Sequence, residues 1–349
     1  SLRRDENGTV LRALDVTAAS LVASASGTLA TAGSTLDGDI RITDLSDLGP
    51  PFAGSVDLTA AFSGTPEDGQ LALLGTGRGL RVGSAEADRL LAGTSAIEAS
   101  LRLAAGVVEL DRARIANPQM TASAKGKLDG AVQTIDLDAR LANLGLIVPE
   151  VQGPLTVTGT ATQDAKGYLL NLQGKGPGQI TAAVAGRVAN GFGSADLTVK
   201  GAGEAGLANL FISPRSISGR VSYDLRLNGP LALRSLTGRM TLADGRLADP
   251  GLGRSLQGIE AVGEFRNGSI QLSANAGVSS GGSLRVAGTV GLASPQSADL
   301  AITLNDVRLY DPELYDTRVN GGLTLKGPLT GGALLAGSLS LSETEVRGP

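Results

Sequence analysis

Apolar and polar residues alternate along much of this chain with a period of two. The pattern is clearest between residues 217 and 250, where four apolar residues are separated by single polar ones: Val221, Tyr223, Leu225 and Leu227. Successive side chains of a β-strand point to opposite faces, so this stretch predicts a half-buried strand. Residues 228–230, Asn-Gly-Pro, predict a turn after it, Met240 and Leu242 resume the alternation, and Asp244-Gly245 predicts a second turn.

This strand-and-turn unit recurs along the chain. Residues 325–329, Leu-Lys-Gly-Pro-Leu, repeat the pattern of residues 227–231, Leu-Asn-Gly-Pro-Leu. Repeat units are recognisable near residues 54–74, 153–173, 217–250 and 319–349. Composition does not shift at any point and no linker is evident, so residues 1–349 are expected to form one continuous β-repeat array.

Four segments carry a likeness to a known family: residues 227–231, residues 242–247 with Pro250, residues 259–272 and residues 281–284. They resemble the TamB family of AsmA-like, bridge-like lipid-transfer proteins of Gram-negative envelopes. These segments are degenerate strand-and-turn motifs without catalytic residues. The resemblance therefore implies an architecture and a role, and it transfers no functional residue.

The expected fold is all-β, an elongated repeat array of antiparallel strands curled into a trough with an apolar interior (β-taco-like) and little helix. Strands do not alternate with helical patterns, which disfavours parallel βαβ folds. Short helical turns are expected only at residues 204–212 and 311–318, where the alternation lapses. In the Ala-rich segment 87–103 we expect a strand from Ile97 onward. Elsewhere, Asp37-Gly38 predicts a further turn.

The repeated apolar stripe must be covered, because a sheet cannot leave a long apolar face in water. The periodicity leaves two solutions open, a closed solenoid or sandwich with a dry core and a trough covered by lipid acyl chains. The resemblance to the TamB family favours the trough. The residues expected to line it are Val221, Tyr223, Leu225, Leu227, Met240, Leu242, Ile270, Leu272, Leu300, Ile302, Leu304, Leu323 and Leu325.

Composition argues against most enzyme classes. The chain contains no Cys and no His, which removes thiolate chemistry, the usual general base and the commonest transition-metal ligand. We expect no enzymatic activity, catalytic residue, metal or cofactor. The formal net charge is −4, and basic residues are spread along the chain, so no nucleic-acid partner is expected.

Three further patterns are weak candidates for sites. Residues 201–206 match the dinucleotide pattern G-x-G-x-x-G, but no βαβ unit surrounds them, so a loop is expected. Acidic pairs and clusters (Asp136 with Asp138; Asp306, Asp311, Glu313 and Asp316) are expected to be solvated rather than to bind Ca²⁺. Arginine pairs (Arg3 with Arg4; Arg112 with Arg114) are expected to be surface residues rather than lipid-phosphate contacts.

The resemblance implies a non-enzymatic bridge that conducts phospholipids through the periplasm between the inner and outer membranes. It also implies an outer-membrane partner of the TamA type, and an inner-membrane anchor in a segment outside these residues. Two alternatives stay open: an assembly factor for outer-membrane β-barrel proteins acting with TamA, and a closed structural β-solenoid.

Overall fold

A computed structural model describes residues 2–5, 8–30, 33–65, 67–105, 107–129, 132–147, 151–209, 213–250, 254–311, 313–329 and 331–346. The chain divides into two compact units, residues 1–176 and residues 177–349. Of the described residues, 73% lie in strands and 7% in helices. The all-β prediction with little helix is confirmed.

The first unit contains twelve of the described strands, one α-helix and two short 3₁₀ turns. In chain order these are β1 Leu2–Asp5, β2 Gly8–Ala18, β3 Leu21–Leu29, β4 Ser34–Ile42, η1 Leu45–Leu48, β5 Ala53–Gly64, β6 Asp68–Arg81, α1 Ala85–Leu90, β7 Thr94–Ala104, β8 Val107–Ala116, β9 Met120–Asp129, β10 Val132–Leu141, η2 Leu144–Leu146, β11 Leu155–Asp164 and β12 Gly167–Lys175.

The second unit contains ten of the described strands and three 3₁₀ turns. They are β13 Thr181–Val188, η3 Asn190–Phe192, β14 Ala195–Glu204, η4 Ala205–Ala208, β15 Ser216–Gly229, η5 Leu233–Ser235, β16 Leu236–Asp249, β17 Arg254–Arg266, β18 Ser269–Val278, β19 Ser283–Gly291, β20 Ser297–Asp311, β21 Tyr315–Pro328 and β22 Leu334–Val346.

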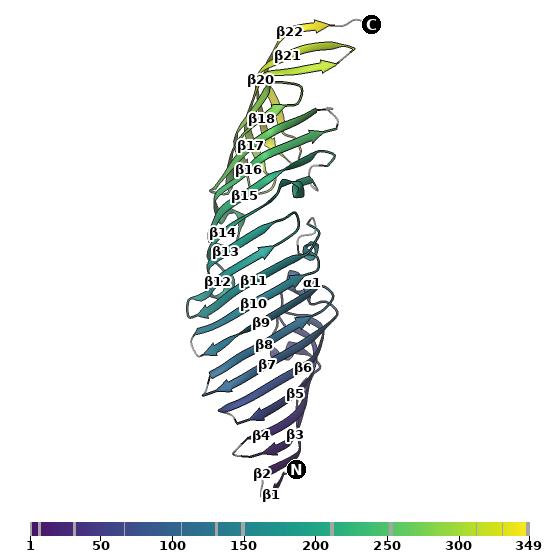
Figure 1. Ribbon diagram of the computed structural model, residues 1–349, viewed down its shortest axis with the longest axis vertical. Helices are drawn as coiled ribbons and strands as arrows, with labels where there is room; N and C mark the ends of the chain where they lie inside the picture. The colour runs from purple at the N-terminus through teal and green to yellow at the C-terminus, as the bar shows by residue number, and fades with distance from the viewer. Residues whose placement is uncertain are drawn as a thin grey trace. The chain divides into compact units, whose positions relative to one another are not determined.

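Within each unit every strand pairs in antiparallel fashion with the strand next to it in the sequence (Figure 1). This meander follows from short connections, because a tight turn can join only antiparallel neighbours. The sheet is open and does not close into a barrel. An open sheet keeps both of its faces available, which agrees with the expected trough.

Two predicted turns are wrong. Asp37 and Gly38 lie inside β4, and Asp244 and Gly245 lie inside β16. At Gly38 a Cβ atom would meet the Ser24 carbonyl oxygen at 2.3 Å, so glycine is present there for close strand approach rather than for a turn. Asp244 has a positive φ of 53° at a register shift between β16 and β17, which is a β-bulge within a continuing strand.

The predictions for helical segments are confirmed in part. Residues 204–212 do contain a short 3₁₀ turn, Ala205–Ala208, while residues 210–212 lie outside the described part. Strand in the Ala-rich segment begins at Thr94, slightly before the predicted Ile97. The predicted helical turn at 311–318 is wrong, because β21 already begins at Tyr315. The alternation lapses there since inward-facing Thr317 is polar and is paired with the Thr344 hydroxyl at 2.8 Å.

Most fully buried apolar side chains lie near the ends of strands. Leu80 closes β6, Leu141 closes β10, Val188 closes β13 and Ala195 opens β14, and each is at most 9% exposed. Apolar residues in the middle of the strands, such as Leu225, are only half-buried. Burial is not confined to strand ends, because Val319 and Val307 lie inside β21 and β20 and are 2% and 5% exposed.

Candidate functional site

One face of the sheet in the second unit is apolar from β15 to β21. Residues directly opposite one another in antiparallel strands project from the same face. Tyr223 lies opposite Met240, Met240 opposite Gly263, and Gly263 opposite Leu272. Leu272 lies opposite Gly288, and Gly288 opposite Leu300. The register therefore carries one face across six strands without a change of side.

All thirteen residues predicted to line the trough lie on this surface, which we call the apolar face. The same register places Leu225 opposite Gly238, Leu300 opposite Leu325, and Ile302 opposite Leu323. Leu300 is 8% exposed, and the other twelve are half-buried: Val221, Tyr223, Leu225, Leu227, Met240, Leu242, Ile270, Leu272, Ile302, Leu304, Leu323 and Leu325. That they share a face is a structural finding. Their contact with lipid stays a prediction.

The first unit has an equivalent apolar face, which was not included among the predicted site residues. Leu36 lies opposite Phe62, Phe62 opposite Leu71, and Leu71 opposite Leu101. Farther along, Leu137 lies opposite Ala124 and Gly159. The signal was present in the sequence as the same period-two alternation, and a rule that selects every inward position would have found these residues.

The apolar face of the second unit carries no charge over the central part of seven strands, because every inward position there is apolar or glycine. These parts are residues 221–227, 236–242, 261–265, 270–276, 284–290, 298–304 and 319–325. Tyr223 contributes the one hydroxyl among these inward positions. A surface of this composition offers no anchor for a phosphate, a sugar or a metal ion. A surface of this kind favours contact with apolar groups.

Tyr223 spans three strands of this face. Its hydroxyl donates to the Thr181 carbonyl of β13 at 2.7 Å. To do so the ring crosses Gly201 of β14, where a Cβ atom would lie 2.5 Å from the Tyr223 hydroxyl oxygen. Burial raises the pKa of the Tyr223 phenol. The tyrosine thus presents its ring to the apolar face and satisfies its polar end against the backbone.

The opposite, polar face is built from cross-strand ion pairs. Arg226 on β15 makes two hydrogen bonds of 2.8 Å to Asp196 on β14, and Lys200 lies 2.8 Å from Asp224. The hydrogen bond from Arg226 holds the pKa of Asp196 below its usual range. Because these charges project away from the apolar face, the two faces of the same strands are chemically separate.

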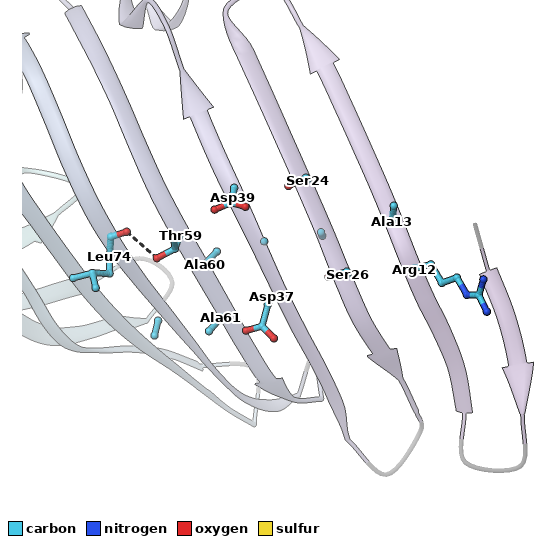
Figure 2. A pocket seen from close by; sticks show the side chains of 13 residues that line it. Arg12, Ala13, Ser24, Ser26, Asp37, Asp39, Thr59, Ala60, Ala61 and Leu74 are labelled. Atoms are coloured by element: carbon cyan, nitrogen blue, oxygen red, sulfur yellow. Dashed lines mark hydrogen bonds between the residues drawn. The ribbon is translucent and has the colours of Figure 1, made fainter.

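The polar face also has a hollow of about 640 Å³ over β2–β6 in the first unit. Figure 2 shows Asp37 and Asp39 projecting into it from β4, with Ser24 and Thr59 on neighbouring strands. The Thr59 hydroxyl donates to the Leu74 carbonyl at 3.1 Å. On the other side of these strands lies an apolar recess of about 210 Å³ whose lining includes Leu14, Leu36, Ile40 and Phe62. Of the two, the recess has the more apolar lining.

The remaining sequence candidates do not form sites. Gly201 and Gly203 lie within β14, where a loop was expected, so residues 201–206 form no phosphate-binding loop. Asp136 and Asp138 are exposed on the polar face, as predicted. Arg114 lies 3.8 Å from Glu98 on the polar face, where Arg112 also lies, and the side chains of Arg3 and Arg4 lie outside the described residues.

The acidic cluster near the end of β20 is organised by arginines. Arg308 makes hydrogen bonds of 2.9 Å and 2.6 Å to Asp316, and Arg318 bonds Asp306. The expectation of loop positions is wrong for Asp306 and Asp316, which lie in strands β20 and β21, and the Asp306 side chain is 49% exposed. Asp311 accepts the backbone N–H groups of Glu313 and Leu314. Among the described residues no group of acidic side chains could hold a metal ion.

The fold and this site define a class of protein: an antiparallel meander whose sheet has one uncharged apolar face and one ion-paired polar face. Residues 271–349 match the family model of the TamB C-terminal domain. This part of the chain, which begins within β18, is similar to the TamB C-terminal domain, and the predicted resemblance is confirmed for these residues. Searches among curated proteins and among solved structures found no match. No described helix has the length and apolar character needed to cross a membrane.

Proposed function

We propose that this chain is a non-enzymatic segment of a lipid-transfer bridge, whose apolar face shields phospholipid acyl chains as they move through the periplasm between the inner and outer membranes. The observation that carries the proposal is the apolar face itself, which is continuous, free of charge and only half-buried. A dry core would bury these side chains fully, as protein interiors are close-packed. Half-buried leucines instead leave surface that acyl chains can cover.

The family match adds the setting. A TamB C-terminal domain is part of a translocation and assembly module, so we propose a periplasmic location, an outer-membrane partner of the TamA type and an inner-membrane anchor outside these residues. The absence of Cys and His supports a role without catalysis or cofactor. Phospholipid headgroups would remain outside the apolar face, because that face offers them no polar partner.

The same family match supports a second candidate, an assembly factor for outer-membrane β-barrel proteins that acts with TamA. The two functions predict different occupants of one surface. A lipid bridge places acyl chains against Leu225, whereas an assembly factor places a strand of the barrel protein there or at a sheet edge.

A photo-crosslinking amino acid at Leu225 tests the proposal in cells. Its neighbour Asp224 lies on the polar face of the same strand and provides the matched control. We expect phospholipid adducts at Leu225 and none at Asp224. Equal labelling at both positions, or no lipid at Leu225, would contradict the lipid bridge. Adducts with a barrel protein that appear only when that protein is expressed would favour the assembly factor.

A further inference from the structure

The connection between β6 and β7 is long compared with the tight turns that join many strands of this sheet, and it contains helix α1. Its base is closed by a hydrogen bond from the Gly79 amide to the Gly93 carbonyl at 2.9 Å. Both glycines have positive φ angles, 59° and 89°, and no atom lies within 4 Å of where their Cβ atoms would be. We call residues 79–93 the flap.

The flap lies against the apolar face rather than away from it. Ser95 is opposite Gly77 in the β6–β7 register, on the same side as Ile97, and it is 0% exposed. Leu80, at the start of the flap, is 9% exposed and packs on Gly77, where a Cβ atom would meet its Cδ1 at 2.7 Å. The apolar face at this end of β6 and β7 is therefore covered by the chain itself.

One asparagine holds the flap in place. The Asn117 Nδ2 group, between β8 and β9, donates to the Leu90 carbonyl at 2.9 Å and to the Ser95 hydroxyl at 2.9 Å. Its Oδ1 atom accepts the amides of Gln119 at 2.9 Å and Met120 at 2.8 Å. The Nδ2 group thus joins the flap to β7 beneath it, and the Oδ1 atom stabilises the turn between β8 and β9.

Further contacts hold the flap loosely. Within it, the Asp88 carboxylate accepts the Val82 amide at 2.8 Å. Helix α1 also lies next to η2, in the connection between β10 and β11. A helix this short is marginal by itself, and hydrogen bonds at a sheet margin are exchanged for water when they open. The flap is therefore expected to open at a lower free energy than the strands beneath it.

We propose that the flap is a displaceable cover of the first unit's apolar face, in which half-buried Leu90 and Leu91 occupy surface that an acyl chain takes when lipid is bound. The inference rests on the proposed function, since it takes the equivalent apolar face of the first unit to bind acyl chains as well. Glycines at both ends of the flap let it swing without strain in the sheet. Lipid and flap then compete for the β6–β8 end of the face.

Limited trypsin digestion of the whole chain measures flap opening, because Arg89 lies in α1 and cleavage there requires the helix to unfold locally. Asn117→Asp keeps the acceptor for Gln119 and Met120 and removes the hydrogen bond to the Leu90 carbonyl, whereas the Ser95 hydroxyl can donate to the new carboxylate. We expect cleavage after Arg89 to become about tenfold faster, the effect of about one lost hydrogen bond on an opening equilibrium. Fragment masses identify the cleaved bond.

The matched control is Asn143→Asp in the connection between β10 and β11. Asn143 Oδ1 likewise accepts two amides, from Gly145 and Gly153, so the same change in charge is made without removing a donor to the flap. A second variant, Asp88→Ala, loosens the flap from within and leaves the sheet untouched. If the rate of cleavage after Arg89 is unchanged in both Asn117→Asp and Asp88→Ala, the flap proposal is wrong.

Dihexanoylphosphatidylcholine below its critical micelle concentration tests the competition, with phosphocholine as the headgroup control. We expect the lipid, and not phosphocholine, to accelerate cleavage after Arg89 in the unsubstituted chain. If Leu225 captures phospholipid in cells but the lipid leaves Arg89 cleavage unchanged or slows it, the flap proposal is wrong and the bridge stands. If Leu225 captures no lipid either, both proposals are wrong.

Discussion

Gly238 on β16 separates two reasons why glycines occur on the apolar face, close approach of the backbone and space for a ligand. Its φ is +116°, and a Cβ atom there would lie 2.3 Å from the Asp224 carbonyl oxygen and 2.9 Å from the Leu225 Cα atom of β15. Gly263, on the adjacent strand β17, faces the same side. There a Cβ atom would meet only the Ile270 Cγ2 methyl, at 3.0 Å.

Substitution by alanine is expected to have a large effect on stability at Gly238 and a small one at Gly263. In Gly238→Ala the disfavoured backbone angle costs about 1–3 kcal/mol. Pushing β15 away from the new methyl group costs about 1–3 kcal/mol more, as overpacking does. The expected loss is therefore roughly 2–6 kcal/mol of unfolding free energy. Gly263→Ala removes conformational freedom from the unfolded chain, worth about 0.4–1 kcal/mol, and asks only one methyl group to shift.

Urea unfolding followed by far-ultraviolet circular dichroism measures the difference. With a slope of about 2 kcal/mol/M, Gly238→Ala should lower the midpoint by roughly 1–3 M. Gly263→Ala should change it little. If both variants unfold at the midpoint of the parent protein, β15 and β16 do not approach as closely as described, and Gly238 serves instead to leave room on the apolar face.

Three further outcomes follow from the same face. Leu225→Asp should cost about 1–2 kcal/mol in thermal or urea unfolding, because water can reach a half-buried position, and should abolish lipid capture by a crosslinker at Leu227 on the same face; a loss of several kcal/mol would indicate a dry core. Tyr223→Phe should cost about 1 kcal/mol of unfolding free energy, because the hydrogen bond to the Thr181 carbonyl is lost. The raised phenol pKa predicts that the parent protein loses stability as pH rises above 10, and this loss should be absent from the variant. Asp196→Asn should reduce the loss of stability on acidification below pH 3.8. The hydrogen bond from Arg226 lowers the folded-state pKa of Asp196, and the stability that this ion pair contributes disappears as the carboxylate is protonated. If the pH dependence of the unfolding free energy is unchanged in the variant, the ion pair contributes no stability.

Strand positions and their sidedness were predictable from local pattern. Between Val221 and Leu227 each apolar residue needs only its own parity to be assigned to a face, and the register confirms the assignment. Turns were less predictable, because glycine has more than one use. The glycine of Asn228-Gly229 does end a strand, whereas Gly38 permits close approach and Gly245 follows a bulge.

The alternation along the chain was sufficient to determine an all-β antiparallel sheet with one apolar face. Alternation is a property of single residues and their neighbours, so one sequence contains it. The tertiary structure alone decided how that face is covered. Tyr223 reaching Thr181 and Asn117 holding Leu90 join residues far apart in the chain, and their contacts depend on how strands and connections approach in space. Period and composition carry no information about such distances, because many loop paths are compatible with the same alternating strands.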